Sequence, residues 1–209
     1  MASRYLWLLD NGHGGVIDGL YQTEGKRSPK WNDGAILYEG EFNRAIVNRL
    51  VEMLTFDRIN YVNIAPELED ISLNERVKRA NSYFNQSKCI YVSIHSNAGG
   101  GKGYEVYTSP GSTKSDKVAT VFFNEFKREF PDVKMRSDML DGDVDKEANF
   151  YVLKHTKMPA ILTENFFMDN EDECKDCLMS REGRDRIALA HYTAIKMIEK
   201  KGLKKASAA

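Results

Sequence analysis

The chain has few cysteines, almost no net charge and no long apolar run, and each shortage excludes a class of protein. Its three cysteines, Cys89, Cys174 and Cys177, are an odd number in 209 residues, which is not the disulfide framework of a small secreted protein. The 30 basic residues nearly cancel the 31 acidic ones. Bulk charge therefore predicts neither nucleic acid binding nor strong attraction to a membrane surface.

Ahead of Asp10 the only apolar stretch runs from Tyr5 to Leu9, which is too short for a signal-peptide core or a membrane span. The sequence as written thus predicts a start in the cytoplasm and no membrane insertion. Repeats, low-complexity tracts and interdomain linkers are also missing. Because 42 % of the residues are hydrophobic, we expect a single domain over residues 1–209, with a polar tail from about residue 202.

Strand-like and helix-like segments alternate along the chain. Short apolar runs predict strands at residues 4–9, 58–65, 89–94, 103–108, 150–153 and 159–163. Apolar positions at helical spacing predict helices from Glu39, after a capping box at Ser72, over about 115–130 and near 181–200. Alternation of this kind implies an α/β sheet with helices on its faces.

Three of the predicted strands end close to residues that can bind or serve a metal, namely His13, His95 and Glu164. In open α/β sheets, ligands bind outside the carboxyl ends of the strands, where residues distant in sequence can meet. Two histidines and one or more carboxylates that meet there indicate a hydrolytic zinc centre, which commonly uses two His and one Glu. We therefore expect one site, with His13 and His95 as a pair of ligands.

The third ligand is expected at the start of the helix that follows, where Glu39 and Glu41 both stand. Residues two apart on a helix point roughly 200° apart, so only one of the two faces inward. Glu39 is the preferred candidate and Glu41 its competitor.

Amide hydrolysis also needs a group that accepts a proton from water and delivers it to the leaving nitrogen. Glu164 suits this role because it follows the apolar pair Ile161 and Leu162, and partial burial raises the pKa of a carboxyl. Four further polar residues are expected to orient ligands or to donate to an oxyanion. They are Asn11, Ser96, Asn97 and Asn165.

Four segments in order resemble the motifs of zinc-dependent N-acetylmuramoyl-L-alanine amidases of the Amidase_3 family. They are DNGHGG at 10–15, EGEFN at 39–43, SIHSNA at 93–98 and PAILTENFFMDN at 159–170. The resemblance implies a twisted, mostly parallel sheet of about six strands between helices. It also implies one zinc ion held by His13, Glu39 and His95, with Glu164 as the catalytic glutamate. The substrate would be peptidoglycan, cut between N-acetylmuramic acid and L-alanine.

The chain departs from the family pattern at three places. Asn11 stands where the family usually has Pro, and Asn165 where it commonly has Gly. The loop over residues 14–38 is longer than expected, and a loop of that length is more often functional than idle, so we expect it to wall the substrate groove.

Three biological roles remain open at this point. The lack of a leader and of an appended wall-binding module resembles a monomeric phage endolysin that waits in the host cytoplasm until it reaches the cell wall. The first rival is a bacterial wall-remodelling amidase whose leader was removed, which would act in the periplasm. The second is a non-catalytic peptidoglycan-binding protein of the same fold.

Other chemistry-bearing residues have simpler interpretations. His155 and His191 lack motif context and are expected to be structural. Cys174 and Cys177 form a Cys-x-x-Cys pair without a second pair, so we expect free cysteines in a helical turn. The aspartates between 138 and 145 lack the terminal glutamate of an EF-hand, which favours a solvated acidic loop.

Overall fold

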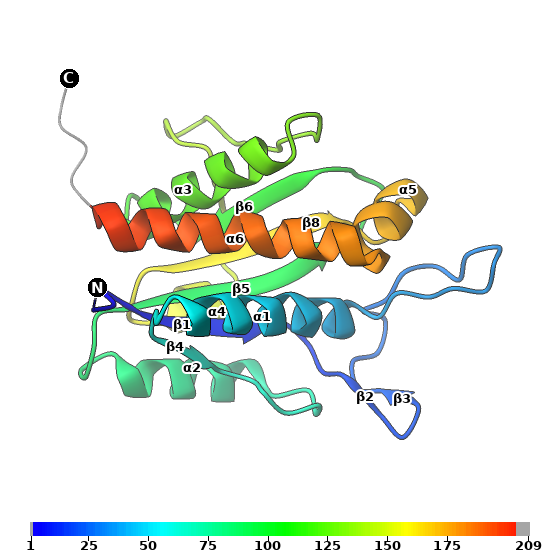
Figure 1. The fold of residues 1–209 in the computed structure, drawn as a ribbon, viewed down its shortest axis with the longest axis horizontal. Helices are drawn as coiled ribbons and strands as arrows, with labels where there is room; N and C mark the ends of the chain where they lie inside the picture. Colours follow the sequence, from blue (N-terminus) through cyan, green and yellow to red (C-terminus); the bar gives the residue numbers. More distant parts are fainter. Residues whose placement is uncertain (1, 204–209) are drawn as a thin grey trace.

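A computed structural model describes residues 2–203 and is built around one six-stranded sheet (Figure 1). The strand order is β4-β1-β5-β8-β6-β7, and all neighbours are parallel except β6 and β8. The bounds are β1 (Leu6–Asn11), β4 (Tyr61–Asn63), β5 (Cys89–Asn97), β6 (Tyr104–Thr108), β7 (Lys146–Glu147) and β8 (Ala160–Phe167). The predicted six-stranded, mostly parallel α/β sheet is confirmed.

Helices cover both faces of this sheet. On one face lie α1 (Glu39–Phe56), α3 (Lys114–Glu129) and α6 (Arg181–Lys201), and on the other α2 (Leu73–Tyr83) and α4 (Tyr151–His155). Successive side chains of a strand point to opposite faces. In β1, accordingly, Trp7 and Leu9 join the core under the first three helices, while Leu8 joins the core under α2 and α4.

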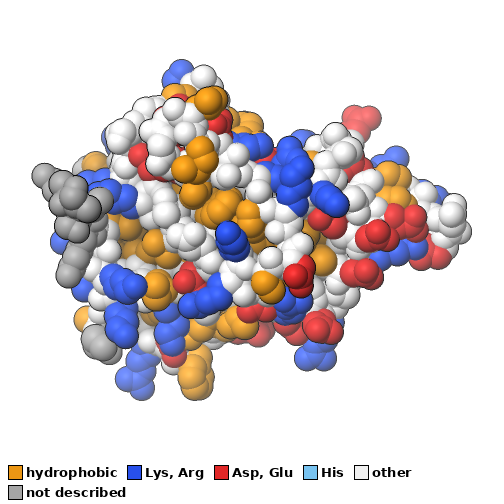
Figure 2. Space-filling view, turned by 90° about the horizontal axis from the view of Figure 1, so that it is seen from above, with side chains coloured by type: hydrophobic (Ala, Val, Ile, Leu, Met, Phe, Trp, Pro, Cys, Tyr) orange, Lys and Arg blue, Asp and Glu red, His pale blue; other side chains and the backbone are white. Residues whose placement is uncertain are grey.

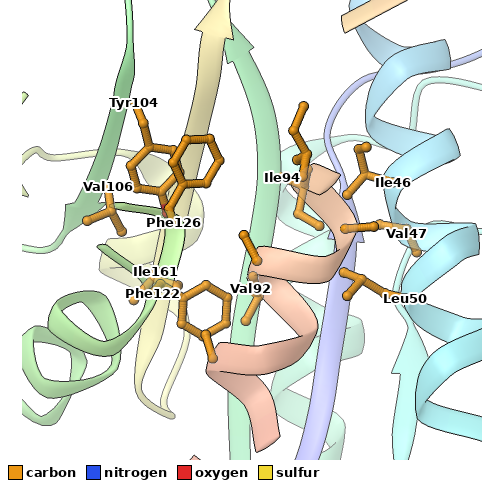
Figure 3. Packing of buried hydrophobic residues seen from close by; sticks show 14 of the residues in the cluster. Ile46, Val47, Leu50, Val92, Ile94, Tyr104, Val106, Phe122, Phe126 and Ile161 are labelled. Atoms are coloured by element: carbon orange, nitrogen blue, oxygen red, sulfur yellow. The ribbon is translucent and has the colours of Figure 1, made fainter. Parts of the chain in front are cut away.

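The larger core fills the space between the sheet and the three long helices, as Figure 3 shows. Ile46 and Leu50 of α1 approach Val92 and Ile94 of β5 from one side of α6. Further along the sheet, aromatic residues of α3 pack on β6 and β8, and Phe126 stacks on Tyr104 with ring centroids 3.9 Å apart. The carboxyl end of β5 is thus held between packed elements on both sides.

One predicted strand is wrong, because residues 150–153 belong to α4. Phe150 is extended and serves as the N-cap, and the two buried residues that follow, Val152 and Leu153, are adjacent rather than alternating. An apolar run of four residues carries no periodicity that separates a strand from a helical turn.

Three strands continue beyond their predicted ends, and β1 runs on to Asn11. β5 and β8 stay paired as far as His95 opposite Glu164, so both residues lie inside strands rather than after them. The register then shifts between His95 and Asn97, where the ladder is irregular.

Small elements surround the carboxyl edge of the sheet. A hairpin of β2 (Val16–Ile17) and β3 (Leu20–Tyr21) projects at the end toward which β5 points (Figure 1). After β8, α5 (Glu171–Glu173) leads into a π-helix, η1 (Cys174–Met179), which places Cys174 and Cys177 in a helical turn as expected, both as free thiols.

The face seen in Figure 2 carries basic and acidic side chains interspersed with hydrophobic ones, in keeping with the net charge of -1. Among residues 2–203, none of the helices combines the length and the apolar character that crossing a bilayer requires. α6 ends at Lys201, and most of the polar tail expected from residue 202 lies outside the described residues.

Candidate active site

Two histidines and a glutamate from three separate segments meet at the carboxyl edge of the sheet. His13 follows β1, Glu39 opens α1 and His95 lies near the end of β5. Glu39 stands between the imidazoles, with Oε2 3.2 Å from His13 Nε2 and Oε1 2.9 Å from His95 Nδ1. Potential ligand atoms of all three lie within 4.8 Å of one another.

Backbone conformation and close approach bring these side chains together. His13 has φ 69°, a left-handed conformation that is uncommon for a residue with a Cβ. A Cβ on Gly12 would lie 2.0 Å from Cε1 of His95, so the missing side chain leaves the space that the imidazole occupies. A Cβ on Gly40 would lie 1.8 Å from the carbonyl oxygen of Gly14, which lets α1 begin against the loop.

The structure places Glu39, and not Glu41, between the histidines. Glu41 points to the hairpin, where its Oε1 accepts a hydrogen bond of 3.0 Å from the backbone N–H of Val16. Glu39 is buried, with 2 % of its surface exposed. Burial raises the pKa of Glu39, but hydrogen bonds and charge from His13 and His95 outweigh this and hold it far below its usual range.

This donor set suits a divalent cation of the zinc type. Neutral imidazole nitrogens and a carboxylate are common zinc ligands, and three protein ligands are typical of catalytic sites. Glu39 is buried and ionised beside two imidazoles, so a dication would compensate its charge without a change of fold.

Glu164 faces the same site from the neighbouring strand. It pairs in register with His95 of β5 and, on its other side, with Glu105 of β6. It lines a cavity of about 580 Å³ together with His13, Glu39 and His95. Its Oε2 atom is buried and has no hydrogen-bond partner among the residues described. Burial, and after it the charges of Glu39 and Glu105, raise the pKa of Glu164 well above its usual range.

Comparison with known proteins identifies the group to which this arrangement belongs. The sequence model of Amidase_3, described as N-acetylmuramoyl-L-alanine amidase, matches residues 8–197. The chain belongs to the Amidase_3 family. Its fold resembles the crystal structure of an N-acetylmuramoyl-L-alanine amidase from Clostridium difficile 630, with a TM-score of 0.78 and 25 % identity, over 96 % of this chain and 100 % of that one.

The curated relatives include a phage endolysin and bacterial amidases. The chain is 30 % identical over 177 residues to the endolysin of Bacillus phage SPP1, which covers 82 % of this chain and 57 % of the endolysin. It is 30 % identical over 165 residues to the sporulation-specific N-acetylmuramoyl-L-alanine amidase of Bacillus subtilis, over 77 % of this chain and 55 % of the relative. A third match is the amidase CwlM of Bacillus licheniformis, 36 % identical over 107 residues, 51 % of this chain and 38 % of CwlM. The Amidase_3 chain thus spans less than two thirds of each of these relatives.

The polar residues expected to support the site take different positions. Asn97 lines the cavity, and its Nδ2 donates to Glu105. Asn165 lies behind it, where Nδ2 donates 2.9 Å to the carbonyl oxygen of His95 and so ties β8 to β5 beside the site. Asn11 is fully buried, and its side-chain oxygen and nitrogen have no partner among residues 2–203. The hydroxyl of Ser96 donates a weak hydrogen bond of 3.5 Å to the carbonyl oxygen of Phe166.

The long loop contributes one residue to the cavity lining. That residue is Lys26, within the range 14–38, and a wider role of the loop as a wall of the groove stays a prediction. Arg27 bridges to Tyr38, and the hydroxyl of Tyr21 accepts 2.9 Å from the N–H of Gly40, so the loop is fastened to the start of α1.

A buried ion pair beneath the site was missed by sequence reasoning. Arg76 of α2 pairs with Asp10 at the end of β1, and the two side chains are each 2 % exposed. Arg76 also donates to the carbonyl oxygens of Asn11, at 2.9 Å, and His13, at 3.3 Å. A usable signal was present, because Arg76 stands four residues before Ala80 and therefore lies on the helical face predicted to be buried.

The remaining candidates lie away from the cavity. His191 is buried and binds Thr163 and the carbonyl of Ile187, and burial lowers its pKa to about 4, as suits a structural role. The solvated acidic loop is wrong for Asp145, which is 2 % exposed and lies with Asp116 and Asp143 within 4.8 Å. Burial and then Asp143 raise the pKa of Asp145 to about 7.

Proposed function

We propose that this chain is a zinc-dependent amidase that hydrolyses the bond between N-acetylmuramic acid and L-alanine in peptidoglycan. The observation that carries the proposal is the convergence of His13, Glu39 and His95 in one cavity with a fourth group, Glu164, whose pKa is raised. Membership of a family described by this activity supports the substrate.

The three proposed ligand residues and Glu164 have different roles in the reaction. A zinc ion bound by His13, Glu39 and His95 would supply a Lewis acid that polarises the scissile carbonyl and acidifies water. Glu164 accepts the proton of the attacking water and returns it to the departing nitrogen of L-alanine. Its Oε2 has no partner among the residues described and is therefore free to exchange a proton, and burial together with the neighbouring carboxylates raises its pKa in the direction that proton transfer needs.

The decisive experiment is digestion of purified sacculi followed by mass spectrometry. Hydrolysis by this mechanism releases intact stem peptides with a free L-alanine amine and leaves the sugar strands uncut. Activity should disappear with a chelator and return with zinc. Release of cut sugar strands, or full activity in the chelated protein, would contradict the proposal.

Three variants test the residues. Glu39→Gln should abolish cleavage, whereas Glu41→Gln should retain most of it because Glu41 only fastens the hairpin. Glu164→Ala should abolish cleavage while the protein still binds zinc. Wild-type rates from Glu164→Ala would refute the assigned proton transfer.

The endolysin role and the expected monomer remain predictions, since one relative is a phage endolysin and another a sporulation-specific amidase. A holin gene beside the encoding gene would support release from the host cytoplasm to the wall. Expression during sporulation or wall growth would support the bacterial alternative.

A further inference from the structure

A series of hydrogen bonds at the cavity floor, here called the hydrogen-bond chain, ends on His95. Oδ2 of Asp10 accepts from the hydroxyl of Ser93 at 2.8 Å and from the hydroxyl of Tyr91 at 2.7 Å. The other oxygen of Asp10 pairs with Arg76. Ser93 Oγ lies 3.2 Å from Nε2 of His95, on the side of the ring away from Glu39.

The donors around Asp10 determine the direction of this chain. An ionised carboxylate only accepts hydrogen bonds, and a hydroxyl has one hydrogen to donate. Ser93 donates its one hydrogen to Asp10, so its oxygen can only accept a hydrogen bond from His95. Nε2 of His95 must therefore carry a hydrogen, which leaves Nδ1 as the nitrogen with a free lone pair when the ring is neutral.

We infer that Ser93 and Asp10 are positioning residues that hold His95 as the Nε2–H tautomer and so present Nδ1 to a metal beside Glu39. Nδ1 is the ring atom that faces Glu39 Oε1 at 2.9 Å, so a bound cation would replace the hydrogen bond that joins the two atoms in its absence. Buried partners of this kind typically fix the orientation and basicity of a metal-bound imidazole. Ser93 is fully buried and Asp10 nearly so, which makes the chain a rigid support.

This inference rests on the proposed metal site, and its first test measures metal affinity rather than cleavage. We expect Ser93→Ala to weaken zinc binding about 10- to 100-fold in competition with a chromogenic chelator. One control separates positioning from general damage. Tyr91→Phe removes the other hydroxyl from the same Asp10 oxygen.

Tyr91→Phe should keep zinc affinity within about threefold of the wild type, since it does not touch the link between Ser93 and His95. Equal weakening in Ser93→Ala and Tyr91→Phe would overturn the inference. The loss of zinc affinity would then come from a changed position of Asp10 and not from the lost hydrogen bond between Ser93 and His95. Circular dichroism and thermal melting confirm that each variant is folded before the affinities are compared.

The second test observes the tautomer itself. In the zinc-loaded protein, the ¹⁵N shifts of the His95 ring should show hydrogen on Nε2, with slow exchange of that hydrogen that Ser93→Ala abolishes. Hydrogen on Nδ1 would overturn the inference. If the wild type binds zinc with this tautomer but leaves sacculi intact, the positioning role stands and the proposed function fails.

Discussion

Replacing Arg76 by Met should destabilise the protein more than any surface change in the same helix. Met fills much of the space of the arginine stem but leaves Asp10 as an unpaired charge that is 1 % exposed. It also removes donors from the carbonyl oxygens of Asn11 and Ile71. Removing one partner of a buried ion pair costs about 3–5 kcal/mol. At about 2–4 °C per kcal/mol for a chain of this size, the melting temperature should fall by about 6–20 °C.

The stability lost in Arg76→Met should depend on pH in a direction that follows from the pKa of Asp10. Burial raises the pKa of Asp10, but Arg76 and the hydroxyls of Tyr91 and Ser93 hold it below its usual value. In the wild type the ionised Asp10 therefore contributes to stability above pH about 3.9, the pKa of an unperturbed Asp. This contribution is lost only as the pH falls through the lower pKa of Asp10 in the folded protein. Without Arg76, burial dominates and the folded pKa rises, so the variant should lose less stability at pH 5 than at pH 8.

Urea unfolding followed by circular dichroism at the two pH values measures both effects. Arg79→Met is the matched control, because Arg79 lies one turn further along α2 in partly exposed ion pairs with Glu67 and Glu75. Such pairs contribute below about 1 kcal/mol each. If Arg76→Met costs no more than Arg79→Met, or if its deficit is the same at both pH values, the assignment of a charged, buried pair is wrong.

Three further results are expected. Gly12→Ala should weaken zinc binding at least tenfold in chelator competition, because the new Cβ would occupy the place of the His95 ring. Relative to the wild type, Asp145→Asn should stabilise the protein more at pH 8 than at pH 5 in thermal melts. The pKa of Asp145 is raised to about 7, so the wild type loses stability as the pH rises toward 7, whereas Asn does not titrate. Zinc at 100 times its dissociation constant should raise the free energy of unfolding by about 2.7 kcal/mol, and a chelator should reverse this in urea titrations.

Elements with a long, regular pattern could be predicted from the sequence. The helix from Glu39 and the apolar run from Cys89 carry enough residues to distinguish a period of 3.6 from a buried strand. Residues 150–153 carry too few, and there the helical turn is decided by the packing of Val152 and Leu153 against α2. Strand ends were also placed too early, because pairing between β5 and β8 continues through polar residues that look like loop.

The site was predictable where chemistry alone selects residues and unpredictable where packing does. His13, His95 and Glu164 stand out as ligand or acid–base types after apolar runs. The choice between Glu39 and Glu41 needed the phase of the helix, which a preference could suggest but only the contact of Glu41 with Val16 decides. The pair of Asp10 and Arg76 depends on a contact 66 residues apart, which no local pattern encodes.

The two roles proposed for the glutamates that face the cavity rest on their different surroundings. Glu39 is buried and Glu164 is partly buried, and burial alone raises the pKa of each. Glu39 has two imidazoles within 3.2 Å that favour its charged form, whereas Glu164 has carboxylates for neighbours and an unpartnered oxygen. Their proton affinities are therefore driven in opposite directions. A carboxyl that stays ionised can hold a cation, and one that binds a proton readily can transfer it, so the assignment of ligand and proton carrier follows from their surroundings rather than from their order in the sequence.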